Sequence, residues 1–181
     1  MKGLIIFADG FEDSEGITTR DILLRGKIEV VTASITDTLD VTTSHNLKIK
    51  TDILLKDAKL DDYQFIILPG GLKGTNNIAS SEVAINAIKY FHNHNKDIYA
   101  ICAAPSILGK LGYLDNKSFT CFKGFEKGIN GRYTGEPATV TSEHIITGKS
   151  MAYSVDFALL ILKKYVDNET YHHVLSGIKS L

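Results

Sequence analysis

Short apolar runs alternate along this chain with longer stretches in which apolar residues recur every three or four positions. The short runs predict buried strands, since they have strand length and end in turn residues. They lie at Gly3–Ala8, Glu29–Ala33, Phe65–Leu68, Asp97–Ile101, Ser118–Phe122 and His144–Thr147. The longer stretches have the spacing of helices with one buried face. They lie at Glu12–Leu24, Glu82–His94, Ala104–Leu111, Tyr153–Val166 and Glu169–Lys179.

This alternation predicts an α/β fold in which helices cover both faces of a mostly parallel sheet. Between the second and third predicted strands, Asp40–Thr43 and Leu47–Lys50 alternate polar with apolar residues around a Ser-His-Asn turn. That pattern predicts a hairpin outside the core. No repeat, low-complexity tract or linker divides the chain, so we expect a single domain over residues 1–181.

Composition narrows the function classes. The 181 residues include 20 Lys+Arg and 21 Asp+Glu, which gives a net charge of −1, and 44% are hydrophobic. Such a chain can bury a sizeable core, which excludes intrinsic disorder. The balanced charge gives no sign of a nucleic-acid partner or a membrane surface.

The compartment and the cysteine chemistry follow from two further features. The apolar run near the start, Leu4–Ala8, is shorter than a signal-peptide core or a membrane span, so we expect a cytoplasmic protein. The two cysteines, Cys102 and Cys121, form neither a disulfide framework nor a zinc motif, and each has to be interpreted by itself.

Three predicted strand ends carry residues suited to chemistry. In parallel sheets, ligands bind beyond the carboxyl ends of the strands. The first strand is followed by Glu12, Asp13 and Glu15, the third by Pro69-Gly70-Gly71, and the fourth runs into a helix at Cys102. We expect Glu12 and Asp13 to stay solvated, because helical spacing does not put all three carboxylates on one face.

Cys102 allows two interpretations. A cysteine between a strand and a helix resembles a nucleophile elbow, and a helix N-terminus near the sulfur would favour the reactive thiolate. The alternative is a small buried hydrophobe, the usual role of a free cysteine. Its position alone does not decide between them.

The glycines and the glutamate have ordinary explanations as well. Gly-Gly is typical of a tight turn, but its uncovered amides also suit an oxyanion hole, formed by the amides of Gly71 and Ala103. A carboxyl group in the first turn of a helix is typically a solvated charge. If Glu15 faces Cys102 instead, it can act as a general acid or base.

Taken together, the motifs resemble the ThiJ/PfpI family, and most closely its parkinsonism-associated deglycase branch and the bacterial relatives of that branch. The resemblance is carried by FADGFEDSE (Phe7–Glu15), ILPGG (Ile67–Gly71), AICAAPSIL (Ala100–Leu108) and SVDFALLIL (Ser154–Leu162). These segments occur in order over almost the whole chain, and the elbow is the most specific of them.

The resemblance implies a flavodoxin-like three-layer sandwich and a homodimer. It also implies that Cys102 is the reactive, easily oxidised residue, that Glu15 hydrogen-bonds to its sulfur, and that the amides of Gly71 and Ala103 line an oxyanion pocket. Family members are credited with glutathione-independent glyoxalase and protein deglycase activities, redox sensing and chaperone-like protection. No metal or organic cofactor is implied.

The chain also departs from the family pattern. Ala103 stands where the peptidase branch has histidine, and Cys121 falls at about the position of a distal histidine in the animal proteins. His45 takes the place of a basic residue that approaches the site across the dimer interface. Lys149-Ser150-Met151-Ala152 replaces Arg-Gly-Pro-Gly. We expect Gly70, His45 and Cys121 to line the site.

Two functional hypotheses follow. The first is an enzyme in which Cys102 attacks a reactive aldehyde or an early glycation adduct and Glu15 transfers protons. The second is a redox sensor or chaperone-like protein that acts through oxidation of Cys102, with Cys121 as a bystander or a resolving thiol. An intracellular cysteine peptidase ranks below both, because its partner histidine is absent. An amidotransferase would need a late His-x-Glu pair, which the chain lacks.

Overall fold

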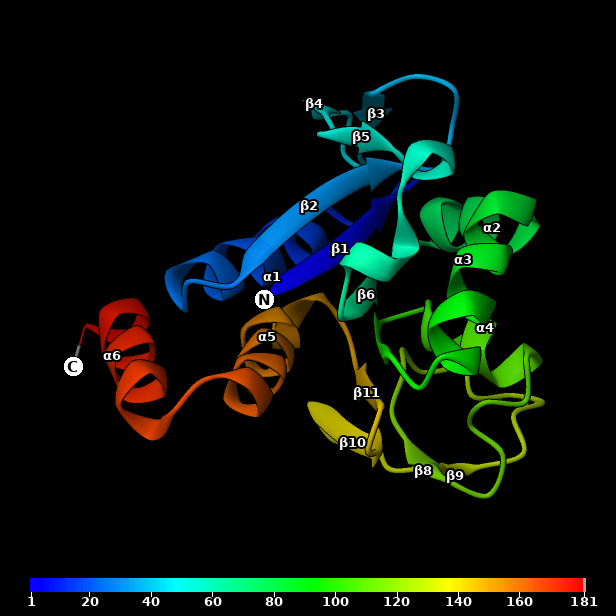
Figure 1. Ribbon diagram of the computed structural model, residues 1–181. Helices are drawn as coiled ribbons and strands as arrows, with labels where there is room; N and C mark the ends of the chain where they lie inside the picture. Colours follow the sequence, from blue (N-terminus) through cyan, green and yellow to red (C-terminus); the bar gives the residue numbers. More distant parts are fainter. Residues whose placement is uncertain (181) are drawn as a thin grey trace.

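Seven strands form the central sheet of the computed structural model, which describes residues 1–180 (Figure 1). Across the sheet they are β10 (Ala138–Ser142), β11 (Ile145–Gly148), β7 (Asp97–Ile101), β6 (Phe65–Leu68), β1 (Lys2–Phe7), β2 (Glu29–Ser34) and β5 (Ile53–Leu54). All neighbours pair in parallel except β10 and β11. The expected mostly parallel sheet is therefore confirmed.

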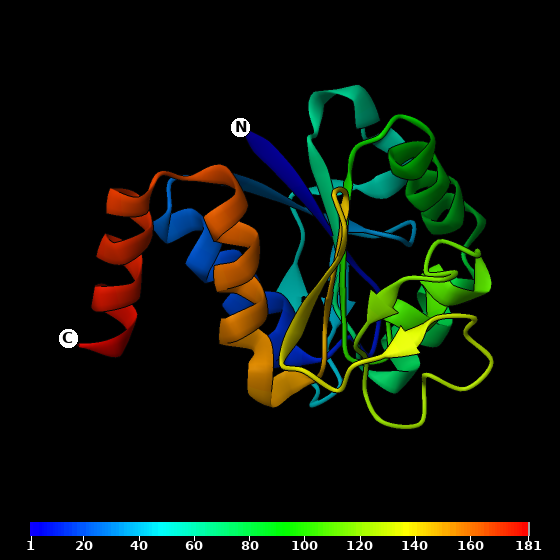
Figure 2. The same ribbon diagram turned by 90° about the horizontal axis from the view of Figure 1, so that it is seen from below.

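Helices cover both faces of this sheet, as Figure 2 shows from below. On one face lie α1 (Asp13–Arg25) and α5 (Ser154–Tyr165), with α6 (Asn168–Lys179) packed outside α5. On the other lie α2 (Leu72–Ser80), α3 (Glu82–Asn93) and α4 (Pro105–Lys110). The chain thus forms the three-layer α/β sandwich that the alternation of apolar patterns predicts.

Each face of the sheet has its own hydrophobic core. Along β1, Leu4 and Ile6 belong to the core beneath α3 and α4, whereas Ile5 and Phe7 belong to the core beneath α1 and α5. This division follows from the two-residue period of a strand, which sends neighbouring side chains to opposite faces. Strands buried on both faces need the continuous apolar runs seen in the sequence.

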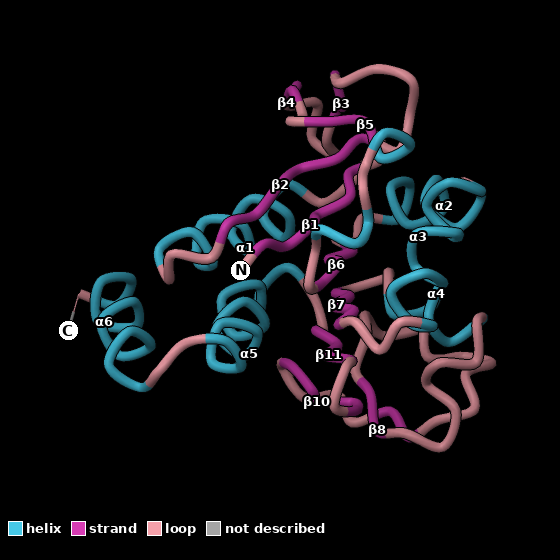
Figure 3. The backbone as a smooth tube through the Cα atoms, viewed as in Figure 1, coloured by secondary structure: helices cyan, strands magenta, loops and turns pink. Residues whose placement is uncertain are grey.

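Among the smaller elements, one prediction is confirmed and one is wrong in its length. The hairpin is confirmed, with β3 (Asp40–Thr42) antiparallel to β4 (Lys48–Lys50). The strand predicted to reach residue 122 ends early, at Phe119, because β8 (Ser118–Phe119) pairs outside the main sheet with β9 (Arg132–Tyr133). A long, mostly irregular segment then leads to the edge strand β10 (Figure 3).

A buried ionic network anchors the end of the sheet where β7 begins. The Asp97 side chain accepts hydrogen bonds from His144 Nδ1 (2.9 Å), Lys164 Nζ (2.6 Å) and Tyr99 OH (3.0 Å), and also from Tyr165 OH. Burial acts to raise the pKa of Asp97, but these bonds outweigh it and lower that pKa. The network ties the β10–β11 turn and the end of α5 to the central strand.

No helix within residues 1–180 has both the length and the apolar character needed to cross a membrane. The adjacent strands β1, β6 and β7 point their carboxyl ends to the same edge of the sheet. The loops that follow them therefore meet at one place, and they are the loops whose residues the sequence marks for chemistry.

Candidate active site

Cys102 lies at the sharp turn between β7 and α4, with Pro105 as the first residue of the helix. Its backbone is left-handed, with φ at +65°, a conformation that costs energy for a residue other than glycine. Hydrogen bonds hold it on both sides, from its own N–H to the Gly148 carbonyl (3.0 Å) and from the Phe122 N–H to its carbonyl (2.7 Å). The elbow predicted from the sequence is confirmed as a local structure.

Glu15 is fully buried in the first turn of α1, although a carboxyl group at that position is typically solvated. One oxygen, Oε2, accepts a hydrogen bond from the Gly70 N–H (2.8 Å), and the other, Oε1, has no hydrogen-bond partner within residues 1–180. Burial raises the pKa of Glu15 to about 7, while its interaction with the Cys102 thiol acts in the opposite direction. A carboxyl group with such a pKa can give or take a proton near neutral pH.

The pKa of the Cys102 thiol is raised when Glu15 is ionised. The position at a helix N-terminus leads us to expect a lowered pKa instead. Burial is the main cause, and the charge of Glu15 adds to it. The amides of Gly71 and Ala103 lower the pKa but do not outweigh these two effects. The thiol therefore holds its proton near neutral pH and must release it when it reacts.

The two glycines let Glu15 and Cys102 approach one another. A Cβ atom on Gly70 would lie 2.6 Å from both Cys102 Cβ and Glu15 Oε2. Gly71 has φ at +84°, and a Cβ atom there would lie 2.5 Å from the Gly10 carbonyl oxygen. Any side chain at either position would force the loops apart, which explains why the turn is Gly-Gly.

The amides of Gly71 and Ala103 are the donors best placed to act on this thiol. Both interact with the sulfur of Cys102 and stabilise its charged form. Neither donates to a backbone carbonyl among the residues that the structure describes. Two N–H groups that contact the nucleophilic sulfur and donate to no backbone carbonyl are the elements of an oxyanion hole.

His45 contacts the carboxylates at the start of α1. In the turn between β3 and β4, its Nδ1 lies 3.0 Å from Asp13 Oδ2 and 3.8 Å from Glu12 Oε1. The bond to Asp13 raises the pKa of His45. Burial acts to raise the pKa of Asp13, but bonds from Thr43, His45 and Ser44 lower it to about 2.

Glu12 and Asp13 are thus half-buried and tied to this turn rather than simply solvated, and within one chain His45 faces these carboxylates and not the thiol. Within residues 1–180, Glu12, Asp13 and His45 are the group that could hold a metal ion, with ligand atoms within 4.8 Å of one another. Exposed groups of this kind are common without a metal, and the expectation of a metal-free site stays a prediction.

Cys121 belongs to a different core cluster from the one that Cys102 contacts. Its side chain is fully buried in the core beneath α3 and α4, whereas Cys102 packs against the core of the opposite face. Burial, with a smaller effect from Glu126, raises the pKa of Cys121 to about 12. Cys121 therefore behaves as a small apolar residue, and the structure offers no support for a resolving thiol.

Comparison with known proteins decides the family. A family model described as DJ-1/PfpI matches residues 1–164. The chain belongs to the DJ-1/PfpI family. The ThiJ/PfpI resemblance seen in the motifs is thereby confirmed.

Individual members of the DJ-1/PfpI family match over most of the chain. Protein DJ-1 homolog B of Arabidopsis thaliana is 34% identical over 92% of this chain, which spans 38% of that protein's length. The glutathione-independent glyoxalase DJR-1.2 of Caenorhabditis elegans is 31% identical, covering 92% of this chain and 89% of that protein.

A solved structure agrees with the fold in detail. The crystal structure of a cysteine-to-alanine variant of a DJ-1 superfamily protein from Salmonella typhimurium aligns with a TM-score of 0.93. It is 27% identical, and the alignment covers 98% of this chain and 97% of that one. The flavodoxin-like sandwich expected from the resemblance is therefore confirmed.

Proposed function

We propose that this chain is a cysteine-dependent, cofactor-free enzyme that acts on α-oxoaldehydes or early glycation adducts. The observation that carries the proposal is the buried Glu15 carboxyl, with a pKa of about 7, beside the Cys102 thiol and the two amides that contact its sulfur. The glyoxalase name of the Caenorhabditis elegans relative supports a small reactive aldehyde as substrate.

In the first step, Cys102 Sγ bonds to the aldehyde carbon. The thiol proton passes to ionised Glu15, whose Oε1 has no other partner within residues 1–180. The electron pair of the C=O bond moves to oxygen, where the amides of Gly71 and Ala103 stabilise the negative charge. Glu15 thereby overcomes the raised pKa of the thiol, because proton loss and attack occur together.

In the following steps, a proton moves between two adjacent carbons. The oxyanion takes back the proton held by Glu15, and Glu15 then removes a proton from the former aldehyde carbon. The oxygen of the neighbouring carbonyl gains a proton, which gives an enediol. The neighbouring carbon then takes up a proton while the hydroxyl on the sulfur-bearing carbon loses one, which gives a thioester of a 2-hydroxy acid. Water cleaves the thioester, which releases the acid and restores the Cys102 thiol. The balance is one aldehyde plus one water, and no external oxidant takes part.

The test is lactate formation from methylglyoxal without glutathione, measured for the wild type, Cys102→Ser and Glu15→Gln. We expect no turnover in the first variant and at least a hundredfold loss, about 3 kcal/mol, in the second. Cys121→Ser is the matched control and should keep its activity, since that thiol lies in the other core. Full activity in Cys102→Ser would refute the proposal.

Redox sensing is the second candidate, favoured by the unpartnered Oε1 atom of Glu15. Two equivalents of hydrogen peroxide would convert the Cys102 thiol to a sulfinate and release two waters. Protonated Glu15 could then donate a hydrogen bond to a sulfinate oxygen. Intact-mass measurement during peroxide titration should show two added oxygens on Cys102. A disulfide between Cys102 and Cys121 would contradict their separation into two cores.

The assembly and the compartment remain proposals as well. We infer a cytoplasmic homodimer, in line with the resemblance. Exposed apolar side chains on α1 support it, because Ile17 and Leu24 are 44% and 40% exposed and lie with Ile49 around one open hollow that charged residues also line.

A further inference from the structure

A second cavity lies at the opposite end of the sheet from Cys102. It has a volume of about 250 Å³ and lies where β7 and β11 begin, next to the Asp97 network. Its walls come from the end of α3, the loop before β8 and the β10–β11 turn, and its apolar floor is formed by Ile98 and Ile145. Nothing in the proposed reaction uses this cavity.

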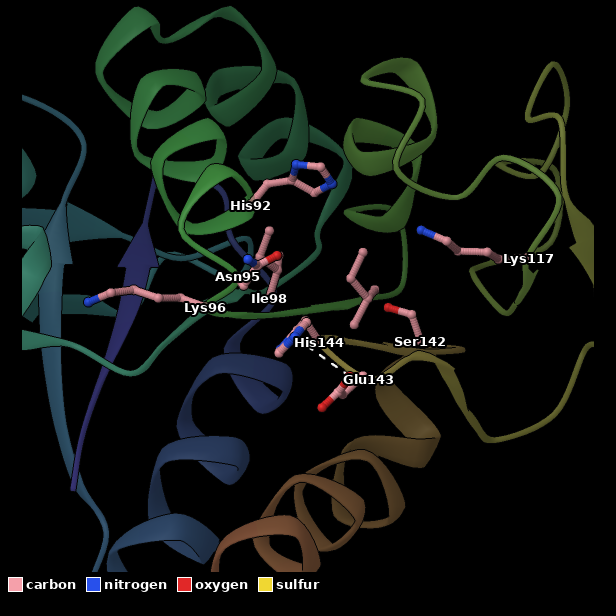
Figure 4. Close-up of a pocket in the computed structure, with 9 residues that line it drawn as sticks. His92, Asn95, Lys96, Ile98, Lys117, Ser142, Glu143 and His144 are labelled. Carbon is pink, nitrogen blue, oxygen red and sulfur yellow. Dashed lines mark ion pairs between the residues drawn. The ribbon is translucent and has the colours of Figure 1, made fainter.

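The cavity lining includes hydrogen-bond donors on Lys117, Ser142 and His92. Figure 4 shows Lys117 and Ser142 with their polar ends toward the space between His92 and His144. The Lys117 ammonium donates to the Tyr113 carbonyl (2.9 Å), which fixes it and leaves two of its N–H groups free.

The two imidazoles are held in place by other contacts. The His92 ring stacks on the Tyr113 ring, with centroids 3.6 Å apart. His144 Nδ1 lies 2.9 Å from the buried carboxylate of Asp97, which can only accept, so Nδ1 carries a proton and Nε2 of the neutral ring is an acceptor. Both rings are therefore oriented before any ligand binds.

The remaining charges make an anion the fitting ligand. Lys96 extends away from the cavity in Figure 4, where its ammonium donates to carbonyls of the segment before β6. Glu143 contributes a carboxylate to the cavity wall, 4.0 Å from His144 Nε2. Because this side chain is 87% exposed, it can turn into solvent when an anion binds. A fixed ammonium at the wall disfavours a metal cation.

We propose that this cavity binds a phosphate group, held by N–H and O–H groups of Lys117, His92 and Ser142. Donors that converge from three elements suit a tetrahedral anion with several acceptor oxygens better than a planar carboxylate with two. The volume exceeds that of the phosphate group alone, so either free phosphate or a small phosphate ester fits the same donors.

Calorimetric titration of the full chain with sodium phosphate tests this inference, against sodium chloride at equal ionic strength. We expect saturable binding below about 10 mM, weakened about tenfold, or about 1.4 kcal/mol, in Lys117→Gln. Lys127→Gln, which removes an exposed lysine from the loop between β8 and β9, is the control and should bind like the wild type.

A second variant and a second ligand sharpen the test. His92→Phe keeps the stack on Tyr113 but removes the donor, and should weaken binding severalfold even if Lys117→Gln is unstable. Tighter binding of glycerol 3-phosphate would identify a phosphate ester as the ligand, and equal binding would identify free phosphate. The inference is overturned if neither binds, if Lys127→Gln weakens binding as much as Lys117→Gln, or if amide NMR shifts map to Cys102 instead.

Discussion

Replacing Glu15 by glutamine should make the protein more stable and less active at the same time. Folding raises the pKa of this carboxyl from 4.5 to about 7. At about 1.4 kcal/mol per tenfold change in the proton equilibrium, holding the ionised group in the folded protein costs roughly 3 kcal/mol. Glutamine carries no charge, but its amide is still buried, so we expect the variant to gain about 1 to 3 kcal/mol.

The gain depends on pH in a definite direction. The folded protein holds the Glu15 proton more tightly than the unfolded chain, so the wild type loses stability as the pH rises from 4.5 to about 7. The whole cost is present above that range and absent below it. The difference between Glu15→Gln and the wild type should therefore be small at about pH 4 and reach its full value at about pH 8.

Urea unfolding under reducing conditions at several pH values measures this difference. Glu82→Gln, which removes an exposed carboxylate from the first turn of α3, is the control and should run parallel to the wild type. A stability difference that stays constant with pH would refute the reasoning, because Glu15 would then not be the buried carboxyl that titrates. Retained turnover in Glu15→Gln would separately refute its role in proton transfer.

Three further outcomes are expected. Gly71→Ala places a Cβ atom 2.5 Å from the Gly10 carbonyl oxygen at a φ of +84°, so thermal unfolding should show a loss of about 1–3 kcal/mol and methylglyoxal turnover should fall with it. Folding lowers the pKa of Asp97, so its hydrogen bonds stabilise the protein at pH values above the ordinary carboxyl pKa, and this stability is lost as the pH falls. Lys164→Met removes one of these bonds and should make the stability measured by unfolding depend less on pH in the acid range. Ile17→Asp should convert the proposed homodimer to a monomer in sedimentation equilibrium, and an unchanged mass would place the interface elsewhere.

The order of apolar runs was enough to predict the sheet and its layers, because strands buried on both faces leave a strong apolar signal. Elements at the edge were missed for the opposite reason. β10 has the exposed Val140 in a largely polar run, and α2 begins with an exposed Leu72, so neither has the apolar pattern of a core element.

The site was predicted in part. The elbow and the Gly-Gly turn are local features, and the sequence displays them directly at Cys102 and Gly71. The burial of Glu15 is set by loops that come from two other strands, and the raised pKa of Cys102 depends on that burial. Cys121 was placed at the site by resemblance, but its side chain takes the other face of the sheet. Such differences depend on tertiary contacts, which a single sequence does not reveal.

The separation of the thiol and the Asp97 network at opposite ends of the sheet has a consequence for protein engineering. The loops around Cys102 can be redesigned for other aldehydes while the anchor that holds α5 and the β10–β11 turn stays intact. Libraries confined to those loops should therefore yield a high proportion of folded variants. The elbow itself is the exception, since its left-handed cysteine is held by Gly148 and Phe122 and tolerates little change in either loop.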